Sequence, residues 1–149
     1  MKEEIEINSR EIFNSRLIEA SPQKIFSAFS DPEHLQKWWG PNGFTNTFQE
    51  FNFSRDGIWN FVMHGPDGRD YVNQSIFREI VIAKKIVIEH LNAPHFILTV
   101  TLEEIKNKTK ISWSMLFDSA ETRNSIAAFV EDANEQNFDR LEKEITSIE

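Results

Sequence analysis

The chain has 149 residues, of which 40% are hydrophobic, and it carries a formal net charge of −8 and no cysteine. At about 100–200 residues per domain, this length predicts a single domain over residues 1–149. The acidic balance, without a cluster of Lys and Arg, argues against nucleic acid as a partner, because binding there requires phosphate neutralisation. The lack of cysteine excludes disulfides, thiolate metal sites and cysteine nucleophiles. Residues 1–4 are acidic and lead to no apolar segment, so we expect a cytoplasmic protein without a membrane span.

The N-terminal third predicts one long strand followed by two short helices. Residues 5–20 place apolar and β-branched side chains at alternate positions, which is typical of a strand. The Ser-Pro pair at 21–22 and the Asp-Pro pair at 31–32 each offer an N-cap followed by proline, and apolar residues then recur at helical spacing. The Gly-Pro pair at 40–41 ends the second helix.

From Phe44 onward the period of the apolar residues changes to two, which predicts a meander of antiparallel strands. Phe48 and Phe51 fall out of phase, so we expect a bulge or bend near Glu50. Turn signals separate the later strands and bring the total to about seven; these signals lie at residues 55–57, 65–68, 92–94 and 106–108.

After the Asp-Ser pair at 118–119 the period returns to that of a helix. Between Ser125 and Ile148 we expect one amphipathic helix of about 35 Å, at a rise of about 1.5 Å per residue. Its apolar stripe contains Ile126, Phe129, Val130, Ala133, Phe138, Leu141, Ile145 and Ile148. A half-buried sheet needs such a helix as a cover, so the predicted class is α+β.

The order of these elements resembles the helix-grip fold of the START/SRPBCC superfamily. In that fold a curved antiparallel sheet wraps around the long C-terminal helix, with two short helices between the first two strands. The local motifs are similar to those of the branch named after the activator of heat-shock-protein-90 ATPase; they lie at residues 16–22, 31–41, 59–68 and 137–141. The resemblance implies an apolar cavity between the sheet and the helix.

The chain departs from that branch in two ways. The co-chaperone that gives the branch its name has a separate N-terminal domain with an activating motif, for which 149 residues leave no room. The final helix in the family often starts its second half with Gly-Trp, whereas residues 132–136 here read Asp-Ala-Asn-Glu-Gln. The first departure speaks against a chaperone role.

Large aromatic and methionine side chains fall on the strand and helix faces that would enclose the cavity. The expected ligand-binding residues are Trp39, Trp59, Phe61, Met63, Tyr71, His90, Trp113, Met115, Phe129, Phe138 and Leu141. The side of the sheet on which Tyr71 lies depends on the loop length of the preceding hairpin. The alternative interpretation of the whole set is a packed core without a cavity.

Little in the sequence points to catalysis. No two histidines have the spacing of a helical zinc motif, so we expect no metal, and no motif calls for a cofactor. The weak candidates for acid or base catalysis are His90 and Glu50. Three hypotheses follow: a protein that binds an apolar or amphipathic small molecule, a cyclase- or hydrolase-like enzyme, or a protein-binding module associated with a chaperone ATPase. A monomer and a homodimer are both compatible with the sequence.

Overall fold

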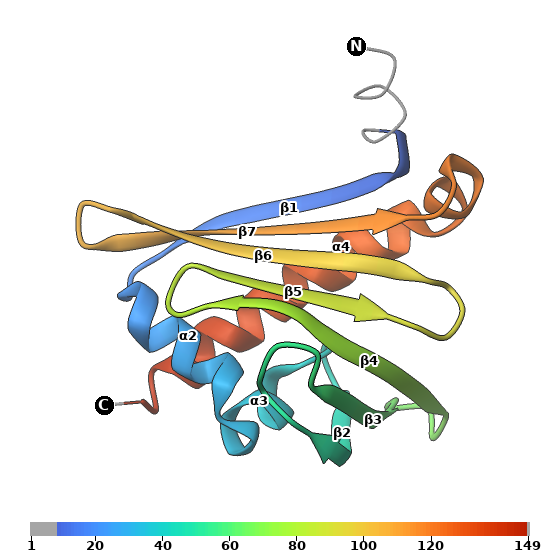
Figure 1. Cartoon of the computed structure of the whole chain (residues 1–149), viewed down its shortest axis with the longest axis horizontal. Helices are drawn as coiled ribbons and strands as arrows, with labels where there is room; N and C mark the ends of the chain where they lie inside the picture. The colour runs from blue at the N-terminus through green and yellow to red at the C-terminus, as the bar shows by residue number, and fades with distance from the viewer. Residues whose placement is uncertain (1–8, 149) are drawn as a thin grey trace.

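The computed structural model describes residues 9–148 of the chain. The strands are β1 (Glu11–Ile18), β2 (Thr45–Phe51), β3 (Ile58–His64), β4 (Asp70–Val81), β5 (Lys85–His90), β6 (Phe96–Ile105) and β7 (Lys108–Phe117). The helices are α2 (Pro22–Ser30), α3 (Pro32–Trp38) and α4 (Ala120–Ile145). The strands form one seven-stranded antiparallel sheet in the order β1-β7-β6-β5-β4-β3-β2, as Figure 1 shows.

Each helix begins at a side chain that accepts a hydrogen bond from a free backbone N–H. The Ser21 hydroxyl accepts from the N–H of Lys24, and the Asp31 carboxylate accepts from the N–H of Glu33. Proline follows at the first helical position in both cases, where its missing N–H costs nothing. Ser119 caps α4 in the same way. The two short helices and their start signals are therefore confirmed.

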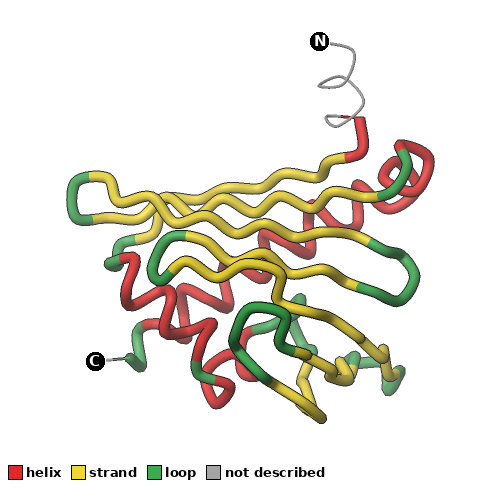
Figure 2. The backbone as a smooth tube through the Cα atoms, viewed as in Figure 1, coloured by secondary structure: helices red, strands yellow, loops and turns green. Residues whose placement is uncertain are grey.

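The sheet is curved, and bulges lie on two of its strands. The pairing of β2 with β3 shifts between Phe48 and Glu50, which confirms the predicted bulge. A second shift, between Phe77 and Glu79 on β4, has no signal that we recognised in the sequence. An extra residue bends its strand and increases the local twist. Figure 2 shows the result, because β2 and β3 turn away from the plane of the other strands.

Helix α4 crosses the concave face of the sheet and lies behind the strands in Figure 1. It packs against β1 and β7 at one side of the sheet and against α2 and α3 near its C-terminal end. Helix α4 starts at Ala120, one and a half turns before the predicted Ser125, because the Ser119 cap lies directly before it.

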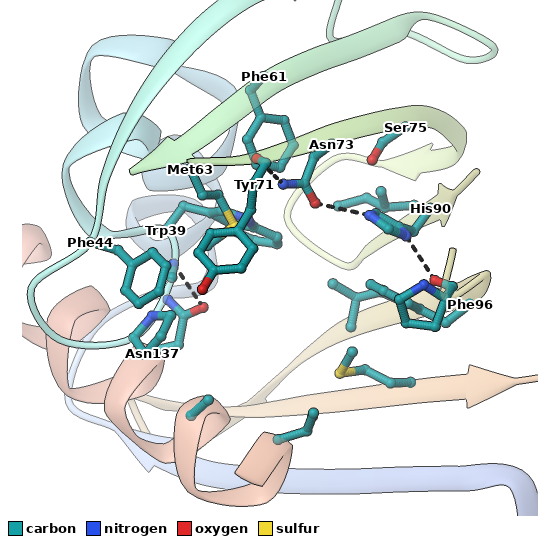
Figure 3. Close-up of a pocket in the computed structure, with 18 of the residues that line it drawn as sticks. Trp39, Phe44, Phe61, Met63, Tyr71, Asn73, Ser75, His90, Phe96 and Asn137 are labelled. Atoms are coloured by element: carbon teal, nitrogen blue, oxygen red, sulfur yellow. Dashed lines mark hydrogen bonds between the residues drawn. The ribbon is translucent and has the colours of Figure 1, made fainter. Parts of the chain in front are cut away.

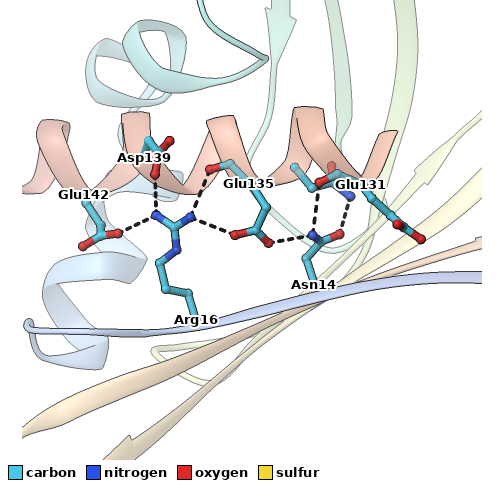
Figure 4. Close-up of polar contacts among 7 residues, drawn as sticks. Asn14, Arg16, Glu131, Glu135, Asp139 and Glu142 are labelled. Atoms are coloured by element: carbon cyan, nitrogen blue, oxygen red, sulfur yellow. Dashed lines mark hydrogen bonds and ion pairs between the residues drawn. The ribbon is translucent and has the colours of Figure 1, made fainter. Parts of the chain in front are cut away.

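A polar network fixes α4 to the edge strand β1 and extends from the buried Asn14 and Asn134 to the exposed Asp139 (Figure 4). The Arg16 guanidinium donates to the carboxylates of Glu135, Asp139 and Glu142 at 2.7–2.8 Å. One turn earlier, the Asn14 amide donates to Glu135, and Asn134 donates back to Asn14 at 3.0 Å. Burial acts to lower the pKa of Arg16, but the three carboxylates outweigh it and raise that pKa.

The core alternates along the strands as the sequence predicts. In β1 the side chains of Ile12 and Ile18 are buried, whereas Phe13 and Leu17 are half exposed. The first four residues of the predicted strand, 5–8, lie outside the described residues. The seven antiparallel strands, the long final helix and the two short helices after β1 confirm the predicted α+β helix-grip fold. Within residues 9–148, no helix is long and apolar enough to cross a membrane.

Candidate functional site

A cavity of about 730 Å³ lies between the sheet and α4. Helix α4 packs against β1 and β7 but stands away from the middle strands of the curved sheet. The cavity is the space between those strands and the helix. The walls come from β3 to β7, the segment after α3, and the side of α4 between Phe129 and Asn137. A volume of this size is within the range of small-molecule sites, about 300–1,000 Å³.

Most of the lining is apolar. Aromatic rings, methionines and aliphatic side chains make up the walls, which include Trp39, Phe44, Trp59, Phe61, Met63, Ile88, Phe96, Leu98, Trp113, Met115 and Val130. Trp39 contacts the rings of both Trp59 and Trp113, at centroid distances of 4.9 and 5.4 Å. Trp38, its neighbour in sequence, is fully buried and donates to the carbonyl of Ala28. Trp38 is thus part of the packed core, whereas Trp39 lines the cavity.

Nine of the eleven expected ligand-binding residues line the cavity: Trp39, Trp59, Phe61, Met63, Tyr71, His90, Trp113, Met115 and Phe129. Phe129 lies at the mouth, because 71% of it is exposed. Phe138 and Leu141 do not reach the lining. Both are fully buried, and the Phe138 ring contacts Trp113 and the Arg16 guanidinium. They belong to the solid core, where α4 comes closest to the sheet.

The hairpin between β3 and β4 determines the side of Tyr71. His64 pairs with Asp70, so the loop covers residues 65–69, an odd number. Tyr71 then pairs with Met63, and Asn73 pairs with Phe61. Directly paired residues point to the same face of a sheet. Tyr71 therefore lies on the cavity side, as Figure 3 shows.

Glu50 does not enter the cavity. The bulge on β2 leaves Gln49 without a pairing partner, and Glu50 pairs with Asn60 and is exposed. The bend at the bulge leaves this side chain exposed and away from the cavity lining. Of the two weak catalytic candidates, only His90 lines the cavity.

His90 is buried in the cavity wall, 7% exposed, between two hydrogen-bonding partners (Figure 3). Its Nδ1 lies 2.9 Å from the carbonyl oxygen of Pro94, and its Nε2 lies 2.9 Å from Oδ1 of Asn73. The imidazole also stacks on the ring of Phe96 at 4.6 Å. Burial lowers the pKa of His90, although hydrogen bonds to the backbone of Pro94 and Asn92 oppose that effect.

The polar groups beside His90 could not be assigned to the cavity from the sequence. Asn73 and Ser75 are on β4, and their side follows from the same hairpin loop that orients Tyr71. Ser75 pairs directly with His90 and is 2% exposed. We call Asn73, Ser75 and His90 the polar corner of the cavity. An odd number of residues in the loop that contains the Gly-Pro-Asp-Gly turn assigns Asn73 and Ser75 to the cavity side, so the loop length was the signal that could have predicted the polar corner.

The rim on the α3 side is held by one arginine. Arg140 of α4 donates to the carbonyl oxygens of Lys37, Trp39, Gly40, Pro41 and Phe44 at 2.8–3.3 Å. Burial lowers its pKa. Asn137 adds two more contacts to the same segment, since its amide donates to Trp38 and accepts from the N–H of Gly40. Helix α4 thereby fixes residues 37–44, which carry Trp39 and Phe44.

A second histidine has the contact pattern of a hydrolase triad. His64 Nε2 lies 2.8 Å from the Thr47 hydroxyl, and its Nδ1 lies 2.7 Å from the Asp70 carboxylate. Thr47 pairs with Val62, on the face of the sheet opposite to Phe61 and Met63. The Thr47 and His64 side chains are thus outside the cavity, where they connect neighbouring strands. Within residues 9–148, His, Asp and Glu side chains form no group of three that could hold a metal ion.

Comparisons with known proteins agree with this architecture. The family profile described as "Activator of Hsp90 ATPase homolog 1-like protein" matches residues 19–146. A solution structure of a protein from Arthrobacter aurescens is 20% identical with a TM-score of 0.86, over 95% of this chain and 88% of the other. A crystal structure of a protein from Nitrosomonas europaea is 15% identical with a TM-score of 0.86, over 93% and 96%.

The AHSA1 protein from Silicibacter pomeroyi is also similar, with a TM-score of 0.76 and 15% identity over 93% of this chain and 99% of the other. At these identities the solved structures show the shared fold, which is of the START/SRPBCC type. No curated protein matches the sequence. The family profile covers most of the chain, from the end of β1 to the end of α4, and the chain therefore belongs to the Activator of Hsp90 ATPase homolog 1-like family.

Proposed function

We propose that this protein binds an apolar or amphipathic small molecule in the cavity between the sheet and α4. The observation that carries the proposal is the cavity itself, about 730 Å³ with walls of aromatic, methionine and aliphatic side chains and one small polar corner. Binding sites for small molecules have this composition, with an apolar wall for affinity and few polar groups for orientation.

The packing around the cavity supports a preformed site. Trp39 packs against both Trp59 and Trp113, and Arg140 and Asn137 fix the rim from α4. Rigid walls lower the entropic cost of binding, because few side chains must be ordered when the ligand arrives. Met63 and Met115 contribute flexible, polarizable surface that adapts to ligand shape.

Fluorescence titration with N-phenyl-1-naphthylamine tests the proposal, since this uncharged apolar dye emits more strongly in apolar surroundings. We expect saturable binding of one dye per chain. Ala133→Trp places an indole in the cavity from α4 and should abolish this binding. Ala128→Trp is the matched control, because Ala128 is exposed on the same helix and outside the lining. Dye bound equally by both variants would contradict the proposal.

A second candidate is catalysis in the same cavity. The observation that favours it is His90, which is buried beside the Ser75 hydroxyl and whose pKa is lowered by burial. A largely neutral imidazole in an apolar cavity can accept or pass a proton. Once a natural ligand is isolated, incubation with the protein and mass analysis distinguish the roles. A changed mass that requires His90 supports an enzyme, and an unchanged mass supports binding alone.

A further inference from the structure

We propose that the natural ligand is an uncharged, mainly apolar molecule whose oxygen atom binds the Ser75 hydroxyl in the polar corner. This inference rests on the proposed ligand-binding function and specifies the chemical class of the ligand. It depends on two properties of the lining. The lining has no cationic Lys or Arg side chain, and the Ser75 hydroxyl forms no hydrogen bond with the described residues.

The lining offers no permanent positive charge to an anionic ligand. Its titratable side chains are Asp70, Tyr71 and His90. Asp70 lies at the rim, and its carboxylate contacts His64 on the outer face of the sheet, so it offers an anionic ligand no positive charge. Burial lowers the pKa of His90, which reduces its positive charge at neutral pH. A carboxylate or phosphate in this cavity would lose its hydration without gaining a cation, and burial of an unpaired charge is strongly unfavourable.

Most polar side chains of the lining already form hydrogen bonds within the protein. The amides of Asn73, Asn92, Asn134 and Asn137 donate to Tyr71, Val72, Asn14 and Trp38 respectively. Each nitrogen of His90 lies 2.9 Å from a carbonyl oxygen, that of Pro94 or Asn73, and the neutral imidazole donates its single N–H to one of the two. The indole N–H groups of Trp59 and Trp113 lack an acceptor among the described residues, but both nitrogens are buried, and each ring packs against other aromatic rings.

Ser75 differs from these groups. Its hydroxyl forms no side-chain hydrogen bond with the described residues, although Ser75 is 98% buried, and it lines the cavity. Figure 3 shows it on the same side of the sheet as Asn73 and His90. The hydroxyl oxygen is not among the buried side-chain atoms that lack a partner, so it stays accessible from the cavity and can form a hydrogen bond with a ligand atom that enters there. The hydroxyl can donate to a carbonyl, ether or alcohol oxygen and can accept from an alcohol.

The surroundings of Ser75 define the rest of the ligand. Trp59 pairs with Ser75 on one side, and on the other side His90 separates it from the Phe96 ring. Beyond this corner the walls are mainly apolar up to the exposed ring of Phe129 at the mouth, and the asparagines among them already form hydrogen bonds within the protein. The fitting ligand therefore has one oxygen at its buried end and an apolar body that extends toward the mouth.

Displacement of N-phenyl-1-naphthylamine by two ten-carbon competitors at pH 8 tests this inference. We expect 1-decanol to displace the dye and decanoate to require at least about tenfold higher concentration, because its carboxylate finds no cation. In Ser75→Ala, the affinity for 1-decanol should fall by about threefold to tenfold, the effect of one hydrogen bond. The dye affinity of each variant is measured directly, so that its displacement gives the affinity for 1-decanol. Ser112→Ala is the matched control, since Ser112 is on the outer face of β7.

Several outcomes would overturn the inference while the proposed function stands. These are equal displacement by decanoate and 1-decanol, failure of 1-decanol to compete, and equal 1-decanol affinity in the wild type and Ser75→Ala. A further contrary result is decanoate binding that strengthens from pH 8 to pH 6 in the wild type but not in His90→Gln, which would assign an anion to protonated His90. Failure of the dye itself to bind would instead contradict the proposed function.

Discussion

The imidazole Nε2 of His90 lies 2.9 Å from Oδ1 of Asn73, across neighbouring strands of the cavity wall. The other imidazole nitrogen faces the Pro94 carbonyl at the same distance. The ring is thus fixed in orientation, and its protonation determines whether the polar corner is neutral or positive.

We predict that His90 titrates below the ordinary histidine pKa of about 6.5, because burial disfavours the imidazolium. Asn73→Asp places a carboxylate at its Nε2 and should raise the pKa of His90 above that value. NMR titration of the imidazole carbon-bound protons measures both. Asn107→Asp, in an exposed turn, adds the same charge away from the site and should leave the pKa of His90 unchanged. An unshifted His90 in Asn73→Asp would contradict the contact.

His95 should show the opposite behaviour. Hydrogen bonds to Glu89 and Asp118 raise its pKa, so the folded state binds this proton more strongly than the unfolded state. Its contribution to stability is complete below pH of about 6.5 and disappears as the pH rises through the raised pKa. We predict that His95→Gln lowers the urea midpoint at pH 6 and changes it little at pH 9. A loss that is equal at both pH values would contradict this account.

Arg16→Met should destabilise the fold by about 1–3 kcal/mol, since it leaves three carboxylates of α4 close together without their cation. Methionine keeps an apolar side chain at this position but loses the guanidinium that lies over the Phe138 ring. Urea denaturation measures the loss, which should shrink in 1 M salt because screening weakens the ion pairs. Arg55→Met, at an exposed turn position, should change stability by less than about 0.5 kcal/mol.

Arg140 determines how firmly the rim is held. Arg140→Lys keeps the positive charge but cannot reach five carbonyl oxygens, so residues 37–44 should loosen. We predict faster amide hydrogen exchange in this segment and weaker binding of the naphthylamine dye. Lys143→Ala, exposed on the following turn of α4, is the control and should leave both unchanged. Unaltered exchange in Arg140→Lys would show that the rim is held by other contacts.

Local sequence signals predicted the elements of this fold well. The Ser-Pro and Asp-Pro pairs act through their own side chains and rings, so each helix start could be recognised from a few neighbouring residues. The bulge near Glu50 was equally visible, because it reverses the phase of the phenylalanines. The direction in which the Glu50 side chain points could not be predicted from the sequence, because it depends on how the bent strand packs.

The site was harder to predict because it depends on distances between elements. Phe138 and Phe129 share the apolar stripe of α4, yet one is in the solid core and the other is at the cavity mouth. The angle at which α4 crosses the sheet determines which residues of the stripe reach the core and which reach the cavity. The periodicity of the helix does not predict this angle. Ser75 is a polar residue in a strand, and only the register of the β3–β4 hairpin assigns it to the inner face.

Methyl-labelled NMR of the protein saturated with N-phenyl-1-naphthylamine tests the central claim most directly, through nuclear Overhauser contacts between dye and methyl groups. The cavity predicts contacts to Ile88, Leu98 and Met115, which line its wall. Leu17 and Ile82 are exposed and lie outside the lining, so they should show none. Contacts to Leu17 or Ile82, without contacts to Leu98 and Met115, would contradict binding between the sheet and α4.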